Sequence, residues 1–159
     1  MTSRSDNYRD DDKNYKLILS EVRRNSSSKI IYHKSLSYYE NIMEHRWAQD
    51  RGYDSALFIN EREEVCETSF ANIFFVRNGE IFTPAISSGL LKGTMRDYIL
   101  ESYKVKEDVI SFKDIDNYDE AFISNSLMGV RNVSSINNVK FNKNEKTKLI
   151  QRNLEEFGF

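Results

Sequence analysis

The sequence has little of the chemistry on which several functional classes depend. Its 159 residues include one cysteine, Cys66, and two histidines, His33 and His45. These counts exclude a disulfide framework and a cysteine- or histidine-rich metal site. The 23 basic and 25 acidic side chains give a net charge of −2, so no basic excess is available to neutralise the phosphates of a nucleic acid. We expect no bound metal and no nucleic-acid partner.

Long apolar runs are missing as well. No stretch of about 18 apolar residues is present, so we expect no membrane span and no membrane partner. The first residues, MTSRSDNYRDDDKNYK, lack the apolar segment of a signal peptide, and a cytoplasmic location is predicted. Residues 1–14 are predicted to form a disordered polar tail, because they cannot bury enough apolar surface to offset their ordering entropy.

From Tyr15 onward the hydrophobic pattern predicts one α+β domain over residues 15–159. The Asn78-Gly79 pair between two apolar runs is the strongest hairpin signal, and Gly52 is expected to end the first helix. Expected strands cover residues 15–22, 55–60, 65–67, 71–76, 80–83, 105–111, 121–124 and 130–136. Expected helices cover residues 35–51, 94–103 and 145–157, with a short helix or turn at 112–117. Within residues 35–51, apolar residues recur every three or four positions and are expected to stack on one face: Leu36, Tyr39, Ile42 or Met43, Trp47 and Ala48.

The usual motifs of nucleotide-binding proteins, metalloproteases and serine hydrolases are missing. Residues 89–94, GLLKGT, open the second predicted helix, where free N–H groups and the helix dipole favour an anion. Most helix starts bind nothing, so this signal is weak alone. Cys66 precedes Glu67, whose charge disfavours a thiolate, and we do not expect a cysteine nucleophile.

Three other positions carry candidate chemistry, and each has a simpler structural interpretation. Lys34 ends an apolar stretch, where a desolvated amine becomes nucleophilic, but most lysines are merely exposed. Glu67 follows a strand, where a carboxylate can hold a cationic ring nitrogen, although a solvated glutamate in a hairpin is the ordinary alternative. Asn125-Ser126 is a polar step between apolar residues, and it also reads as a turn bonded to its own backbone.

In combination these segments are specific. The order of Lys34-Ser-Leu-Ser-Tyr-Tyr-Glu-Asn, Glu67-Thr-Ser-Phe-Ala-Asn, Gly89-Leu-Leu-Lys-Gly-Thr-Met-Arg and Phe122-Ile-Ser-Asn-Ser-Leu-Met-Gly resembles the class IV aminotransferase family. These are pyridoxal-phosphate enzymes of fold type IV, and the resemblance covers residues 17–136. It implies the large domain of that fold, with mixed sheets in a pseudo-barrel flanked by helices, and pyridoxal 5'-phosphate as cofactor.

The resemblance also implies roles for residues around the cofactor ring. Lys34 matches the lysine that binds the cofactor covalently and moves the substrate's proton. Glu67 matches the carboxylate that pairs with the ring nitrogen and keeps it protonated. Leu91 matches the leucine packed on the ring face, and Tyr38 is expected near the ring hydroxyl.

The cofactor's phosphate is assigned in the same way. Thr94 and Met95 match the residues whose backbone N–H groups bind the phosphate at a helix start, with Gly93 before them. Ser126 matches a hydroxyl on the same phosphate, and Asn125 lies beside it.

Two details resemble aminodeoxychorismate lyase within the family. Met95 stands where the transaminases usually have threonine, and residues 125–130, NSLMGV, are similar to the lyase segment. The implied reaction converts 4-amino-4-deoxychorismate to 4-aminobenzoate and pyruvate, toward folate. A branched-chain or D-amino-acid aminotransferase of the same fold is the first alternative. A truncated, inactive remnant that folds, dimerises or binds the cofactor is the second.

The sequence departs from the family at its amino-terminal side. A small domain normally precedes the strand at Tyr15 and supplies an arginine to the cofactor phosphate. Neither Arg23 nor Arg24 matches that arginine by position. The resemblance therefore implies the large domain alone, a separately encoded small domain as a partner, and a homodimer.

Overall fold

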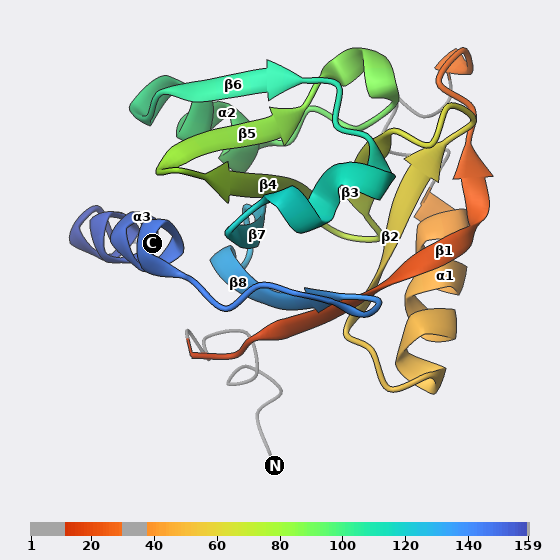
Figure 1. Cartoon of the computed structure of the whole chain (residues 1–159), viewed down its shortest axis with the longest axis horizontal. Helices are drawn as coiled ribbons and strands as arrows, with labels where there is room; N and C mark the ends of the chain where they lie inside the picture. The colour runs from red at the N-terminus through yellow and green to blue at the C-terminus, as the bar shows by residue number, and fades with distance from the viewer. Residues whose placement is uncertain (1–11, 30–37, 159) are drawn as a thin grey trace.

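One curled, mixed sheet organises the computed structural model, which describes residues 12–29 and 38–158 (Figure 1). Its strands are β1 (Tyr15–Arg24), β2 (Ser55–Asn60), β3 (Val65–Thr68), β4 (Asn72–Arg77), β5 (Glu80–Pro84), β6 (Val105–Asp108), β7 (Glu120–Asn125), β8 (Gly129–Ile136) and β9 (Val139–Lys140). The helices are α1 (Tyr38–Asp50), α2 (Thr94–Ser102) and α3 (Glu145–Glu156), with 3₁₀ turns η2 (Ile86–Ser88) and η3 (Phe112–Asn117). The predicted α+β class is confirmed.

The strand order is β3-β2-β1-β8-β7-β4-β5-β6, and β9 pairs with β8. Parallel pairs join β1 to β2 and β5 to β6, with α1 and α2 as the respective crossovers. The pairs β2–β3, β4–β5 and β7–β8 are antiparallel. The antiparallel pairing of β4 with β7 brings the β4-β5-β6 and β7-β8 segments together. The parallel pairing of β1 with β8 then joins this arm to the arm formed by β1, β2 and β3.

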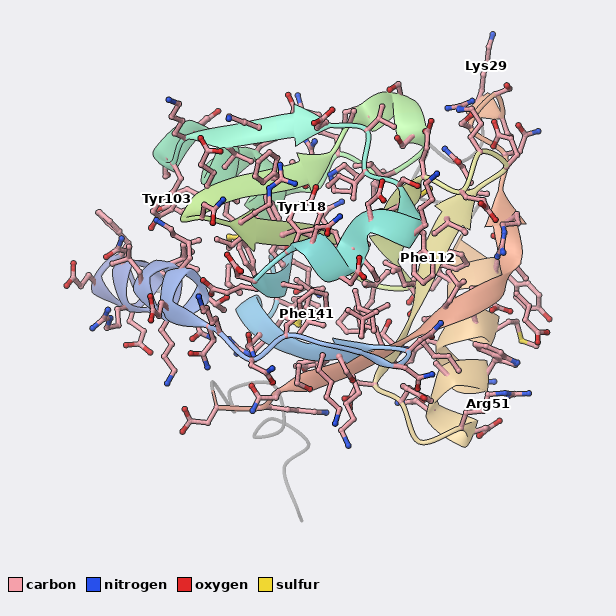
Figure 2. The ribbon with its side chains drawn as sticks, viewed as in Figure 1. Lys29, Arg51, Tyr103, Phe112, Tyr118 and Phe141 are labelled. Carbon is pink, nitrogen blue, oxygen red and sulfur yellow. The ribbon has the colours of Figure 1, made fainter. Side chains whose placement is uncertain are left out.

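Two apolar cores lie on opposite faces of the sheet. The inner face curls around η3, whose Ile115 is buried among residues of seven strands (Figure 1). Phe141 is buried in this core, and Phe112 and Tyr118 pack against it (Figure 2). The outer core packs α2 and α3 against the sheet, and there the rings of Phe74 and Phe122 stack with centroids 4.8 Å apart. Burying side chains of this size stabilises the fold by about 2 kcal/mol each.

Several local predictions are confirmed. Asn78 and Gly79 have positive φ values of 51° and 76°, as expected for a two-residue hairpin turn. Gly52, with φ of 82°, follows the end of α1 and donates its N–H to the carbonyl of Gln49. Residues 112–117 form the 3₁₀ turn η3, and α2 and α3 begin at the predicted residues.

Other predictions are wrong in detail. The first strand continues through Arg24, predicted to lie in a loop, because Arg23 and Arg24 pair with β2. The strand predicted over 105–111 ends at Asp108, and the short strand β9 was not predicted. Tyr39 and Met43 are 74% and 46% exposed, so the predicted apolar face of α1 is not buried along its length; Ala48 is its buried residue.

Some expectations fall outside the described ranges: Lys34, Leu36 and most of the predicted tail. Of that tail, Lys13 forms an ion pair of 2.9 Å with Asp54, and Asn14 accepts a hydrogen bond from Asn132. Within the described ranges, no helix combines the length and the apolar character needed to cross a membrane.

Candidate active site

The Asn72 side chain holds the loop that leads into α2. Its Nδ2 donates to the carbonyl of Leu91 at 2.8 Å, and its Oδ1 occupies the space where a Cβ on Gly93 would lie. Position 93 therefore accepts only glycine without a shift of the Asn72 amide. Because Asn72 begins β4 and pairs in register with Ser124 of β7, the loop is fixed against two central strands.

Glu67, on β3, contacts the same loop that leads into α2. It is 7% exposed, and its Oε2 accepts the backbone N–H of Leu91 at 3.1 Å. Burial raises the pKa of Glu67 to about 7, although Arg24 and the Leu91 N–H both act to lower it. The carboxylate is thus a buried anion that gains from a cationic partner.

The start of α2 presents backbone N–H groups that precede the hydrogen-bond ladder of the helix. The first bond of the helix runs from the N–H of Asp97 to the carbonyl of Gly93 at 3.0 Å, so the N–H groups of Thr94 and Met95 precede the ladder. Gly93 is the N-cap and supplies no side-chain cap. The Met95 side chain is buried in the outer core, which leaves only its backbone for a ligand. This geometry suits an anion.

The end of β7 and the turn that follows it contribute hydroxyl groups. Ser124 is buried, and its Oγ has no hydrogen-bond partner among the described residues. Asn125 donates to the carbonyl of Phe70 at 3.2 Å and accepts the N–H groups of Leu127 and Met128. The Asn125 side chain therefore shapes the turn, while Ser126 is exposed.

Arg24 and Asn72 were not among the predicted site residues. Arg24, 3% exposed, ends β1 with its Nη2 4.0 Å from Glu67 Oε1. Arg24 lies in a polar stretch of sequence, Arg23-Arg24-Asn25-Ser26. Such a stretch predicts an exposed loop, and for that reason Arg24 was not predicted as a site residue. Asn72 stood inside the motif that begins at Glu67, and that was the signal that could have found it.

The structure brings some of the predicted site residues together and not others. Glu67, Leu91 and Gly93 are linked by the contacts of Asn72 and the Leu91 backbone. Ser124 pairs with Asn72, which places the turn at 125–126 on the adjoining strand end. Tyr38 begins α1 and is 64% exposed. Lys34 lies outside the described residues.

These groups form a coherent set of polar partners: a buried carboxylate, the backbone N–H groups at a helix start, and a buried hydroxyl that has no partner among the described residues. A ligand that carries a cationic ring nitrogen at one end and an anionic group at the other matches it. Pyridoxal 5'-phosphate is such a molecule, and the residues present fit it.

Comparison with known proteins identifies the class of protein. The chain matches the family model of amino-transferase class IV over residues 2–136, and it belongs to that family. It is 30% identical over 131 residues to aminodeoxychorismate lyase of Vibrio harveyi, covering 77% of this chain and 48% of that protein. A branched-chain-amino-acid aminotransferase of Arabidopsis thaliana is 33% identical over 111 residues, which are 65% of this chain and 29% of the relative.

Solved structures agree. A Legionella pneumophila protein, provisionally named 4-amino-4-deoxychorismate lyase, superposes with a TM-score of 0.85 at 30% identity, covering 91% of this chain and 56% of that chain. A branched-chain aminotransferase of Thermobaculum terrenum, solved in its PLP form, gives a TM-score of 0.82 at 26% identity, over 91% of this chain and 51% of that chain. The fold is the large domain of fold type IV, as predicted. The chain spans about half the length of the curated relatives it matches.

Proposed function

We propose that this chain binds pyridoxal 5'-phosphate through Lys34 and forms the cofactor-carrying part of a 4-amino-4-deoxychorismate lyase. The observation that carries the proposal is the buried Glu67 carboxylate, joined through the Leu91 N–H to the loop that opens α2. Membership of the family supports the cofactor, as does the likeness to a relative solved in its PLP form.

Each described residue has a defined part in this proposal. Glu67 Oε1 would accept a hydrogen bond from the protonated ring nitrogen, because Oε2 already accepts the N–H of Leu91. The N–H groups of Thr94 and Met95 bind the phosphate, with the hydroxyl of Ser126 on the same group. Gly93 keeps the loop close to β4, Leu91 packs on the ring, Asn125 holds the turn, and Tyr38 lies near the ring hydroxyl.

Lys34 supplies the covalent link and the proton transfer. Its Nζ would hold the cofactor covalently, and the same amine would accept the proton of the substrate carbon. When bound, the cofactor withdraws electrons from that carbon. The charge on Glu67 assists by keeping the ring nitrogen protonated.

The lyase is preferred to a transaminase on two grounds. Met95 and residues 125–130 are similar to the lyase motifs, and lyase relatives occur at 30% identity in both sequence and structure. Branched-chain aminotransferases also match, at 28% and 33% identity, and they define the alternative reaction. The protein is incubated with 4-amino-4-deoxychorismate, and the appearance of fluorescent 4-aminobenzoate would support the lyase. Release of a branched-chain keto acid from an amino acid would instead support the transaminase.

Cofactor binding is tested directly on the chain. Protein incubated with pyridoxal phosphate should develop a visible absorption band, and borohydride reduction followed by peptide mass spectrometry should find the pyridoxyl group on Lys34. Lys34→Ala should lose both signals, whereas Lys92→Ala, a control at an exposed lysine of the α2 loop, should keep them. Absence of the band and of the adduct in the unaltered chain would overturn the proposal and favour an inactive remnant.

The proposed function also includes two protein partners. We infer a homodimer, and a small domain as a partner that completes the substrate pocket and supplies an arginine to the phosphate. Light scattering after size exclusion tests the first. Lyase activity that appears only when a small-domain polypeptide is added tests the second, and activity of the chain alone would contradict it.

A further inference from the structure

Arg24 is a buried cation with an unusual set of partners. Its Nη1 lies 3.3 Å from Glu40 Oε1 of α1, and its Nη2 donates to Asn41 Oδ1. The guanidinium carbon lies 3.9 Å from the centre of the Phe58 ring. Burying a charge is costly unless partners compensate it, so α1 and β2 together hold this side chain in one place.

The guanidinium of Arg24 faces the Glu67 carboxylate but does not form a hydrogen bond with it. Arg24 Nη2 lies 4.0 Å from Glu67 Oε1, which is longer than a hydrogen bond. Glu67 Oε2 is already occupied by the Leu91 N–H. Charge attraction at this distance remains strong in a buried setting, while the lone pairs of Oε1 are not taken by Arg24.

The charged surroundings of Glu67 come from several elements. Arg24 on β1 lowers the Glu67 pKa against the larger effect of burial. Glu40 of α1 is on the far side of Arg24, and the neighbouring Cys66 stays a thiol because burial raises its pKa to about 12. Arg24 is therefore the described cation that favours the ionised form of this carboxyl.

We propose that Arg24 is a positioning residue for Glu67: gripped by Glu40 and Asn41, it keeps the carboxylate charged and leaves Oε1 free for the ring nitrogen of pyridoxal phosphate. The inference rests on the proposed function. Helix α1, which supplies Glu40 and Asn41, follows Lys34 closely in the sequence.

The decisive readout is the location of one proton. With Arg24 present, the proton between Glu67 and the cofactor ring belongs on the ring nitrogen. Arg24→Met retains the length of the side chain and removes its charge, so the proton should move toward Glu67. Nitrogen-15 NMR of ring-labelled pyridoxal phosphate bound to the protein distinguishes the two positions.

Affinity gives a second measurement. Titration of pyridoxal phosphate at a series of pH values should show weaker binding for Arg24→Met near neutral pH. A rise of about one in the Glu67 pKa from about 7 lowers the charged fraction of the carboxyl at pH 7, and with it the affinity, roughly fivefold. Arg23→Met is the matched control on the same strand, because Arg23 bonds to the Ser20 carbonyl instead. It should bind like the unaltered chain.

Two further variants keep the test informative if Arg24→Met does not fold. Arg24→Lys retains a cation and should restore the protonated ring nitrogen. Asn41→Ala loosens the guanidinium and should shift the pH profile in the same direction as Arg24→Met, by less. If the chain forms the Lys34 adduct but the Arg24 and Asn41 variants leave the nitrogen signal and pH profile unchanged, this proposal is overturned and the proposed function stands. Absence of the adduct in the unaltered chain overturns both.

Discussion

The Glu67 carboxylate accepts the backbone N–H of Leu91 at 3.1 Å, and this bond joins a strand of one arm of the sheet to the loop that opens α2. The same oxygen pair faces Arg24. The buried Glu67 carboxylate thus positions the loop and also provides the negative charge that would pair with the ring nitrogen of the cofactor. Its protonation state should therefore be visible in the stability of the protein as well as in ligand binding.

The first prediction concerns that protonation. The folded-state pKa of Glu67 is about 7, above the ordinary value of 4.5, so the folded protein holds this proton more tightly than the unfolded chain. The stability that this provides is present in full below pH 4.5 and is lost as the pH rises through 7. The cofactor-free protein should lose on the order of 2–3 kcal/mol of unfolding free energy from this group across that window.

Urea unfolding of the unaltered chain and of Glu67→Gln, at matched pH values, checks this. The glutamine retains an acceptor for the Leu91 N–H and cannot titrate, so the difference between the two proteins should change steadily with pH. Glu80→Gln, at an exposed residue paired with Lys106, should show no such trend. A constant difference between the unaltered chain and Glu67→Gln would contradict the prediction.

The second prediction concerns Gly93. Its φ of −78° is one that alanine adopts readily, so Gly93→Ala tests contact rather than backbone strain. The added methyl group meets Asn72 Oδ1 and should cost about 1–3 kcal/mol of unfolding free energy. Affinity for pyridoxal phosphate should fall as well, since the loop carries the N–H groups of Thr94 and Met95.

A double mutant separates the contact from other effects. In an Asn72→Ala background the obstructing amide is gone, and adding Gly93→Ala should then cost much less than it does in the unaltered chain. Equal costs in the two backgrounds would show that Asn72 and Gly93 do not interact. Thermal and urea unfolding provide the free energies.

What the sequence could predict was mostly local or encoded in motifs. The Asn78-Gly79 turn and the end of α1 at Gly52 need only positive φ values, which neighbouring residues do not alter. Glu67 and the loop at 89–94 were found because motifs in the right order mark them. These signals require no knowledge of which strands pair.

The rest depends on contacts across the chain. Arg24 lies in a strand because it pairs with Asn60, and its role near Glu67 requires residues of β1, β3 and α1 to meet. Asn72 reaches Gly93 only because the loop returns to β4. The hydrophobic pattern of a short sequence window does not indicate which distant residues come into contact. Tertiary packing therefore overrides the local preference of Arg24 for a loop.

The third prediction concerns the reactivity of Cys66. Burial, with a further contribution from the Glu67 charge, raises the pKa of this thiol from 9.0 to about 12. Because the thiolate is the reactive form, labelling by a disulfide reagent should be at least roughly a thousandfold slower in the folded protein than in urea. Rapid stoichiometric labelling of the native chain, followed by absorbance of the released thiol, would disprove it.

The last prediction concerns how α3 is attached. The side chain of Asn144, the N-cap residue, makes no capping hydrogen bond to the helix. Instead the buried Glu120 of β7 accepts the N–H of Lys146 at 3.1 Å and the N–H and hydroxyl of Thr147 at 3.2 Å. An acid at a helix start satisfies free donors and complements the helix dipole. Glu120→Gln should cost about 1 kcal/mol by removing the charge, and Glu120→Ala about 2 kcal/mol or more by leaving buried donors unpaired.

Urea unfolding of these variants should be compared with Glu145→Gln, which removes an exposed charge from the same first turn. The control should lose less than about 0.5 kcal/mol, because solvent screens its interaction with the dipole. High salt should diminish that small effect and leave the Glu120 losses nearly unchanged, since buried groups are screened little. Equal, salt-sensitive losses at both positions would mean that Glu120 acts only through its charge. The strand β7 would then not serve as the cap of α3, and the packing of Ile150 and Leu154 against the sheet would have to hold the helix by itself.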